Sequence, residues 1–261
     1  MRIKQIKRLE KQLGSALFER LGRSVRLTSA GEGPHKMALG ILQQVAEAET
    51  RIAALNEGYD SLRIGVIPTI MPYFIARRIG DFTRKFPRVN PQFREETTSQ
   101  LVEALQAGEI DLAVVNLPVP KADIVCSKLF REELLLVVPR KHPLSGHPLV
   151  NLQALRNERL LLLKEGHCLR DDVLTACTRA KAELRSVFET NQMESIFEPV
   201  RSGFGLSVVP EMASSNAAGC TRVRLQNTSY RRIGYIRARR HLVSRPMREF
   251  TSWLCSIAKD E

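Results

Sequence analysis

The sequence predicts an α/β protein in which a small basic N-terminal part and a long helix precede a larger domain. From Leu62 onward, short β-rich runs alternate with helical patterns, which is typical of an α/β fold with a largely parallel sheet. Before Leu62, apolar residues recur at helical spacing in two separate stretches. With 261 residues, 43% of them hydrophobic, the chain is long enough to bury one large core or two smaller ones.

The first stretch predicts an amphipathic, basic helix. Its apolar face consists of Ile3, Ile6, Leu9 and Leu13, with basic side chains between them, and Gly14 supplies a C-terminal stop. The segment 20–28 then places a glycine turn between two short alternating pieces, which predicts a small basic β-hairpin that looks like a wing.

Positive charge is concentrated in this N-terminal part. Its first 30 residues carry eight basic side chains against two acidic ones, in a chain of net charge +12. A basic helix beside a basic hairpin favours contact with nucleic-acid phosphates, although a solvated basic face is the plainer alternative. We expect the residues that contact DNA to be Arg2, Lys4, Lys7, Arg23 and Arg26.

The second stretch predicts a long helix with an apolar seam. The seam follows alternating steps of three and four residues, and it consists of Ala38, Ile41, Val45, Ala48, Ile52 and Leu55. This spacing indicates either pairing with a second copy of the chain or packing against its own domain. Residues 58–61 end the helix and serve as a linker.

The larger domain alternates strands and helices. The predicted strands cover residues 62–67, 91–95, 112–115, 134–138, 160–163 and 206–209. The predicted helices cover residues 72–85, 98–108, 169–182, 193–202 and 247–258.

Several functional classes are excluded by composition and spacing. The longest apolar runs, 134–138 and 160–163, are far shorter than the ~20 residues of a membrane span, and the charged N-terminus has no signal-peptide core. The cysteines lack CxxC spacing and the five histidines are scattered, which argues against a metal site. The glycines of segment 203–205 follow a helix and precede a strand, the reverse of a dinucleotide fingerprint. We expect a cytoplasmic protein without cofactor, metal or membrane contact.

Cys168 and Cys177 both fall on one predicted helix. Nine residues at ~1.5 Å per residue separate their Cα atoms by about 13 Å, whereas a disulfide needs roughly 4.4 to 6.8 Å. A bridge between them therefore requires the segment to unwind. Five cysteines in a chain without an export signal predict thiols that are reduced, so a disulfide here would be transient and regulatory.

The surroundings of Cys168 predict a reactive thiol. A position at a helix N-terminus beside His167 and Arg170 is expected to lower its pKa, and the alternative is a structural free cysteine. Thr69 follows an apolar strand and Thr98 opens a helix, so their hydroxyls could hold a small polar or anionic ligand. Simple N-capping is the alternative for both threonines.

Two groups of segments carry a resemblance to a known family. Segments 5–14, 17–20 and 27–31 resemble the end of the winged helix-turn-helix of LysR-type transcriptional regulators, and segments 64–65, 105–113 and 200–210 are similar to the effector domain of that family. The resemblance covers essentially the whole chain. It implies a partial winged helix-turn-helix in residues 1–31, a dimerising linker helix in 32–60, and in 61–261 an effector domain of two α/β lobes like a periplasmic binding protein. It also implies a DNA-binding regulator that forms a homodimer or homotetramer.

Within the family, the peroxide-sensing OxyR subgroup is the most similar. The similar segments are 68–69, 98–101 and 166–171, followed by Cys177, and Asp172 stands where that subgroup usually has glutamine. The resemblance implies that Cys168 reacts with hydrogen peroxide and forms a reversible disulfide with Cys177. The residues that it places around the peroxide are Thr69, Thr98, His167 and Arg231.

Members of the family carry further residues before the position at which this sequence begins. We therefore expect an N-terminally truncated regulator whose binding to double-stranded DNA is weakened or lost, because base readout depends on the start of the recognition helix. Two other functions stay open. One is a LysR-type regulator that is induced by a small carboxylate between the lobes and has inert cysteines, and the other is a thiol peroxidase that uses Cys168 and His167.

Overall fold

The computed structural model describes residues 2–21, 24–57, 60–179, 185–226, 230–240 and 242–259. The chain forms two compact units, Met1–Glu57 and Gly58–Glu261. Across the described ranges, no helix combines the length and the apolar character that crossing a membrane requires.

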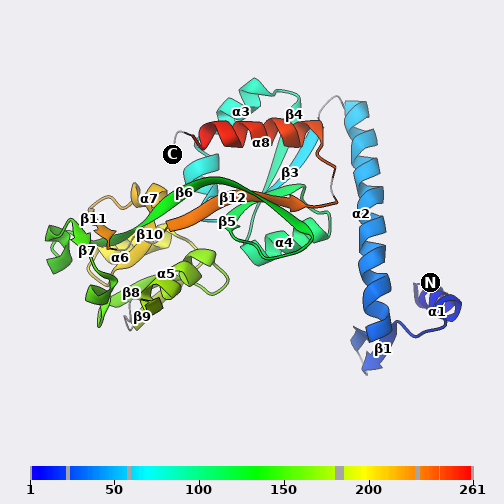
Figure 1. Cartoon of the computed structure of the whole chain (residues 1–261), viewed down its shortest axis with the longest axis horizontal. Helices are drawn as coiled ribbons and strands as arrows, with labels where there is room; N and C mark the ends of the chain where they lie inside the picture. Colours follow the sequence, from blue (N-terminus) through cyan, green and yellow to red (C-terminus); the bar gives the residue numbers. More distant parts are fainter. Residues whose placement is uncertain are drawn as a thin grey trace. The chain divides into compact units, whose positions relative to one another are not determined.

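The N-terminal unit contains a basic helix, a hairpin and a long helix. Its elements are α1 (Arg2–Leu13), the antiparallel strands β1 (Phe18–Leu21) and β2 (Ser24–Leu27), and α2 (Ser29–Glu57) (Figure 1). The backbone N–H groups of Leu17 and Phe18 donate to Glu10 Oε1 at 2.9 and 3.2 Å, which ties the hairpin to α1. The predicted helix and hairpin are both confirmed, and the hairpin turn at 22–23 lies outside the described residues.

The long helix α2 begins closer to the hairpin than its seam predicts. Thr28 Oγ1 accepts the N–H of Gly31 at 3.1 Å, which caps the first turn. A Cβ atom on Gly31 would lie 2.1 Å from the carbonyl oxygen of Leu17, so only glycine fits at this close approach.

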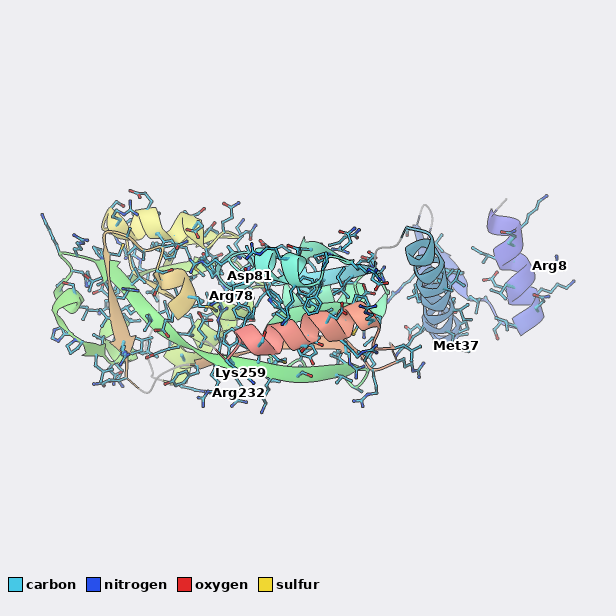
Figure 2. All side chains as sticks on the ribbon, turned by 90° about the horizontal axis from the view of Figure 1, so that it is seen from above. Arg8, Met37, Arg78, Asp81, Arg232 and Lys259 are labelled. Atoms are coloured by element: carbon cyan, nitrogen blue, oxygen red, sulfur yellow. The ribbon has the colours of Figure 1, made fainter. Side chains whose placement is uncertain are left out.

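The seam of α2 has exposed side chains within the N-terminal unit. Ile41 and Val45 are 59% and 49% exposed, and the neighbouring Met37 projects from the helix (Figure 2). Pairing with a second copy and packing against its own domain are both arrangements that would cover these side chains. The side chains of Ile52 and Leu55 lie outside what the structure describes, and both arrangements stay predictions.

The larger unit has two hydrophobic cores, and the first one surrounds a parallel sheet. Its elements are β3 (Asp60–Val66), β4 (Val89–Glu95), β5 (Leu112–Leu117), the π-helical turn η1 (Met71–Ile75), α3 (Ile79–Lys85), α4 (Thr98–Gln106) and α8 (Arg245–Ile257). Aromatic rings join α3 to α8, because the ring centroid of Phe82 lies 5.2 Å from the ring centroids of both Phe250 and Trp253.

The second core contains the helix on which Cys168 and Cys177 lie, called the cysteine helix. Its helices are α5 (Cys168–Arg179), α6 (Glu194–Arg201), α7 (Glu211–Ser214) and the short 3-10 turns η2 (Pro143–Gly146) and η3 (Leu152–Leu155). Its strands are β7 (Leu149–Val150), β8 (Arg159–Leu163), β9 (Arg185–Thr190), β10 (Ser207–Pro210) and β11 (Cys220–Leu225).

Two long strands cross between the cores. β6 (Ile124–Pro139) begins in the first core and ends in the second, and it pairs antiparallel with β12 (Tyr230–Ala238), as Figure 1 shows. Through them the strands join in the order β4-β3-β5-β12-β6-β11-β7, with β10 also on β6. The two expected lobes are therefore present and share β6 and β12.

Some expectations about the larger domain are wrong. The sheet is mixed rather than largely parallel, because β12 pairs antiparallel with β5 and β6, and β10 and β11 pair antiparallel with β6. The helix predicted over 72–85 is divided, since the N–H of Ala76 bonds to the carbonyl of Met71 in a π-type turn before α3 begins. Strands β7, β9, β11 and β12 were not predicted. In β11 and β12 arginines interrupt the apolar alternation, and β7 has only two residues.

Candidate functional site

Cys168 opens α5 and faces a small pocket. The turn before it contains Gly166 with φ +94°, a conformation that favours glycine. The pocket is lined by Ile67, Pro68, Thr69, Thr97, Thr98, Gly166, His167 and Cys168. Its volume of about 10 Å³ is the space of roughly one water-sized molecule. Three of the predicted ligand-binding residues, Thr69, Thr98 and His167, thus lie together with the thiol.

Arg231 reaches this site from β12. Its Nη1 donates to Thr69 Oγ1 at 2.7 Å and its Nη2 donates to the carbonyl of Thr69 at 3.0 Å. Its Nη2 also pairs with Glu132 Oε2 at 2.6 Å, and its side chain is fully buried. Glu132 Oε1 in turn accepts the N–H of Met212 at 2.9 Å. The ion pair with Glu132 holds the guanidinium group of Arg231 in place behind Thr69.

Thr98 presents its hydroxyl to the pocket beside the Cys168 thiol, whose pKa it lowers by hydrogen bonding. Its Oγ1 atom is buried, and apart from this contact with the thiol it has no hydrogen-bond partner among the described residues. A buried polar atom without its full set of partners is costly, so it marks a place where a small polar molecule would be stabilised.

The electrostatics of the thiol differ from the sequence prediction. Burial raises the pKa of Cys168 above its ordinary value, and the positive charge that opposes this rise comes from Arg231. The expected lowering of the pKa by His167 and Arg170 is therefore wrong. Arg170 instead donates a hydrogen bond of 2.6 Å to Glu189. Burial lowers the pKa of His167, so its imidazole is uncharged at pH 7.

Cys177 lies in a different environment from Cys168. Its side chain is fully buried in the second core, and burial raises its pKa to about 11. All five cysteines are free thiols. Because α5 is helical from Cys168 to Arg179, the two cysteines are about 13 Å apart along its axis.

Two polar residues of the site were missed by sequence reasoning. Glu132 lies at the middle of the unbroken strand β6, and its only signal is a carboxylate just before an apolar run. Asn116 lies on β5, where its Nδ2 donates to Asp172 Oδ2 at 2.8 Å. No sequence pattern pairs residues so distant along the chain.

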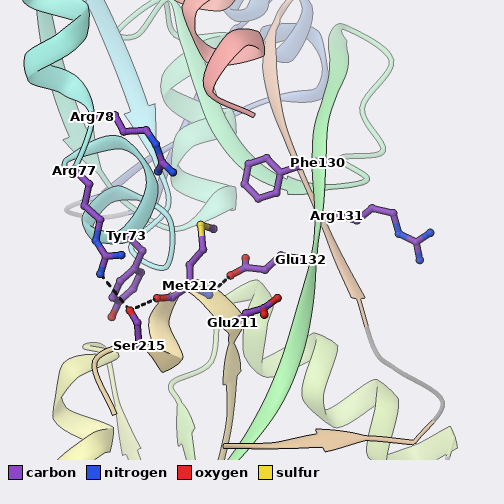
Figure 3. A pocket seen from close by; sticks show the side chains of 9 residues that line it. All are labelled: Tyr73, Arg77, Arg78, Phe130, Arg131, Glu132, Glu211, Met212 and Ser215. Atoms are coloured by element: carbon purple, nitrogen blue, oxygen red, sulfur yellow. Dashed lines mark hydrogen bonds between the residues drawn. The ribbon is translucent and has the colours of Figure 1, made fainter. Parts of the chain in front are cut away.

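A second, larger cavity lies beyond the Arg231–Glu132 pair. It has a volume of about 530 Å³ and is lined by Tyr73, Arg77, Arg78, Phe130, Arg131, Glu132, Glu211, Met212 and Ser215 (Figure 3). Arg77 Nη2 donates to Ser215 Oγ and Asn216 Oδ1, both at 3.3 Å, whereas Arg131 points away and lies over the Tyr230 ring. The volume is in the range of small-molecule sites.

The predicted DNA-contacting residues are only partly described. Lys4, Lys7 and Arg26 are exposed on α1 and β2. Arg23 lies outside the described residues, as does the side chain of Arg2. In the described part of the chain, no group of three His, Cys, Asp or Glu side chains could hold a metal ion.

Comparison with protein families decides the wider classification. The family model of the LysR substrate binding domain matches residues 56–256, and that of the bacterial regulatory helix-turn-helix protein of the lysR family matches residues 3–32. The chain belongs to the LysR family. Its members are DNA-binding transcriptional regulators with an effector domain and are not enzymes. The thiol peroxidase alternative is therefore wrong.

Several LysR-family relatives carry names that refer to peroxide. The chain is 35% identical over 207 residues to a probable hydrogen peroxide-inducible genes activator of Streptomyces viridosporus, covering 78% of this chain and 66% of the relative. It is 31% identical over 210 residues to the dual regulator OxyR of Escherichia coli K12, covering 80% and 69%. The aligned part thus spans about two thirds of the length of these relatives.

Solved structures show the same architecture. A full-length OxyR variant from Pseudomonas aeruginosa matches with a TM-score of 0.73 and 30% identity over 97% of this chain and 83% of that one. A peroxide-bound OxyR variant from Corynebacterium glutamicum matches with a TM-score of 0.71 and 25% identity over 98% and 82%.

Proposed function

We propose that this LysR-family regulator senses hydrogen peroxide through a reversible disulfide between Cys168 and Cys177. The observation that carries the proposal is the pocket in which the Cys168 thiol, the buried hydroxyl of Thr98 and the Thr69–Arg231 pair surround space for a water-sized molecule. Peroxide is small enough for this space, whereas an organic carboxylate is not. The name of the Streptomyces viridosporus relative, a probable hydrogen peroxide-inducible genes activator, supports the same function.

The chemistry proceeds in two steps. The Cys168 thiolate attacks one peroxide oxygen, the O–O bond breaks, and the leaving hydroxide takes a proton and departs as water, which leaves a sulfenic acid. The thiol of Cys177 then attacks the Cys168 sulfur, the S–S bond forms, and the hydroxyl leaves as a second water. Arg231 stabilises the thiolate, and the Thr98 hydroxyl donates to the peroxide. A cellular dithiol reverses the disulfide.

The disulfide is a conformational signal. Because α5 must unwind for the two sulfurs to meet, the surfaces against which it packs change, and the subunits of a homodimer or homotetramer repack. The affinity of the N-terminal unit for DNA then changes, because its contacts with the phosphates change. These contacts are made by Lys4, Lys7 and Arg26, together with Arg2 and Arg23. Such a regulator works in the cytoplasm, where thiols are kept reduced until peroxide appears.

Trapping the sulfenic acid tests this function. In the reduced Cys177→Ser variant, one equivalent of peroxide in the presence of dimedone should label Cys168 alone. The control Cys255→Ser, which removes an exposed thiol, should still form the disulfide. Dimedone labelling spread over the other cysteines, or none at all, would reject the proposal.

A second function is favoured by the larger cavity. A regulator induced by a small carboxylate could bind its ligand there, because Arg77 lies on the wall and no carboxylate among the described residues pairs with it. Phenylacetate is a suitable probe, and its neutral analogue 2-phenylethanol is the matched control. If this function holds, phenylacetate raises the melting temperature of the reduced protein, Arg77→Gln abolishes the shift, and Arg131→Gln keeps it. No saturable shift with phenylacetate would exclude this function.

A further inference from the structure

Asp172 links the cysteine helix to the other core. It lies four residues after Cys168 on α5, so both side chains are on the same face of the helix. Its Oδ2 accepts a hydrogen bond of 2.8 Å from Asn116 Nδ2 on β5. The orientation of this amide is fixed, because Asn116 Oδ1 accepts the N–H of Arg232 at 3.1 Å. The bond therefore ties the first turns of α5 to the sheet of the first core.

The charge of Asp172 is poorly compensated in this position. The carboxyl is half-buried, and its hydrogen-bond donor, Asn116, is neutral. The nearby cation is Arg231 of β12, but that guanidinium already pairs with Glu132 of β6. On its own helix Asp171 and Cys168 add no positive charge, and the cation Arg170 pairs with Glu189 at 2.6 Å instead. A buried carboxylate with a single amide donor is costly in its ionised form.

The disulfide removes Asp172 from this position. Asp172 lies between Cys168 and Cys177, and the helix must unwind over this interval before the two sulfurs can bond. Unwinding returns the carboxyl to water, where the ionised form is favoured. The cost of burying the charge is then released.

We propose that Asp172 is a positioning residue of the thiol switch: ionised, it favours the unwinding that brings Cys168 to Cys177, and protonated, it keeps α5 folded against Asn116. This inference rests on the proposed peroxide function for its role, but the opening of α5 can be measured without peroxide.

The direction of the pH effect follows from linkage. Burial raises the pKa of Asp172 to about 6 in the folded helix, and unwinding returns it to its ordinary lower value. The folded helix thus binds the proton more tightly, so acid stabilises it and opening becomes easier as the pH rises through 6. Between pH 5 and pH 7.5 the opening equilibrium should increase about tenfold.

Hydrogen exchange of the reduced full chain, read by mass spectrometry on peptides of α5 and corrected for intrinsic rates, tests the inference. Asp172→Asn keeps the acceptor without the charge, so its opening should lose its pH dependence. At pH 7.5 opening should fall about a hundredfold, because the pKa of Asp172 differs by about two between the folded and the open helix. Asn116→Ala should increase opening, because it removes the amide donor. The matched control Asp171→Asn removes the exposed carboxylate of the same turn and leaves Asp172 in place, so its opening should keep the pH dependence of the natural chain.

The outcomes separate the two proposals. Exchange in Asp172→Asn that equals that of the natural chain at pH 7.5, with the same pH dependence, overturns the role of Asp172. If Asn116→Ala does not fold, the comparison of Asp172→Asn with Asp171→Asn still decides. The predicted exchange pattern in a protein whose cysteines ignore peroxide would support the role of Asp172 in opening α5 and reject the peroxide function.

Discussion

Arg231 and Thr69 are 162 positions apart in the sequence, yet two hydrogen bonds of 2.7 and 3.0 Å join them behind the thiol pocket. They bring a strand from the C-terminal part of the chain to the loop that follows β3. Glu132 completes the arrangement from β6, so three distant segments meet at one buried charge.

Breaking the buried ion pair should destabilise the fold. Arg231→Met removes the guanidinium that pairs with the buried Glu132, and we expect a loss of about 3 to 5 kcal/mol in the free energy of unfolding. Adding Glu132→Leu should recover most of this loss, because a buried ion pair can be replaced by apolar groups at little cost. Urea denaturation of the single and double variants measures both changes. A double variant less stable than Arg231→Met would contradict the account.

Thr98→Val should separate reactivity from stability. Apart from the Cys168 thiol, the buried Oγ1 of Thr98 has no partner among the described residues, so replacing the hydroxyl by a methyl group should leave stability unchanged or slightly higher. The reaction of Cys168 with peroxide should slow about tenfold or more, because the hydroxyl no longer donates to the peroxide. Stopped-flow rates and thermal melts on the same samples check the prediction. A faster reaction, or a large drop in melting temperature, would refute it.

The reaction of Cys168 should depend steeply on pH. Burial raises the pKa of this thiol above its ordinary value, so its thiolate remains a minor species near neutrality. The rate of sulfenic acid formation in Cys177→Ser should then rise about tenfold per pH unit from pH 7 to 8.5. A rate that levels off below pH 7 would show a thiol with a lowered pKa and would restore the expectation from sequence.

The N-terminal unit should bind DNA through phosphates. Lys7→Gln and Arg26→Gln, each on an exposed position, should weaken binding to any duplex to a similar degree. Each substitution should also lower the slope of log affinity against log salt by about 1. Fluorescence anisotropy over a salt series measures this slope. The substitution Lys121→Gln, in the larger unit, is the control and should leave the slope unchanged.

Much of the fold follows from local patterns in the sequence. The basic helix, the hairpin, the long seam and the apolar strands were predictable because burial imposes a period of two or 3.6 on apolar residues. Strands such as β12 escaped because Arg231, Arg232 and Arg237 interrupt this pattern, although Arg231 is fully buried by its pairing with Glu132. The antiparallel orientation of the strands in the sheet could not be predicted either, since it depends on how β6 and β12 cross between the cores.

The candidate site was predictable in part. Cys168, His167, Thr69 and Thr98 do line one pocket, as the resemblance implies, and their roles remain proposals. The electrostatics were not predictable, because a sequence shows which charges are neighbours along the chain and not how deeply a thiol is buried. Arg170 is adjacent in sequence but pairs with Glu189, whereas the cation that acts on the thiol comes from β12.

Peptide mapping of the reduced protein after a brief, stoichiometric dose of hydrogen peroxide tests the central claim most directly. The account predicts one new disulfide, between the peptides that carry Cys168 and Cys177, with a loss of two hydrogen atoms from the intact mass and reversal by dithiothreitol. Unreacted thiols, or a bridge that involves Cys126, Cys220 or Cys255 instead, would contradict it.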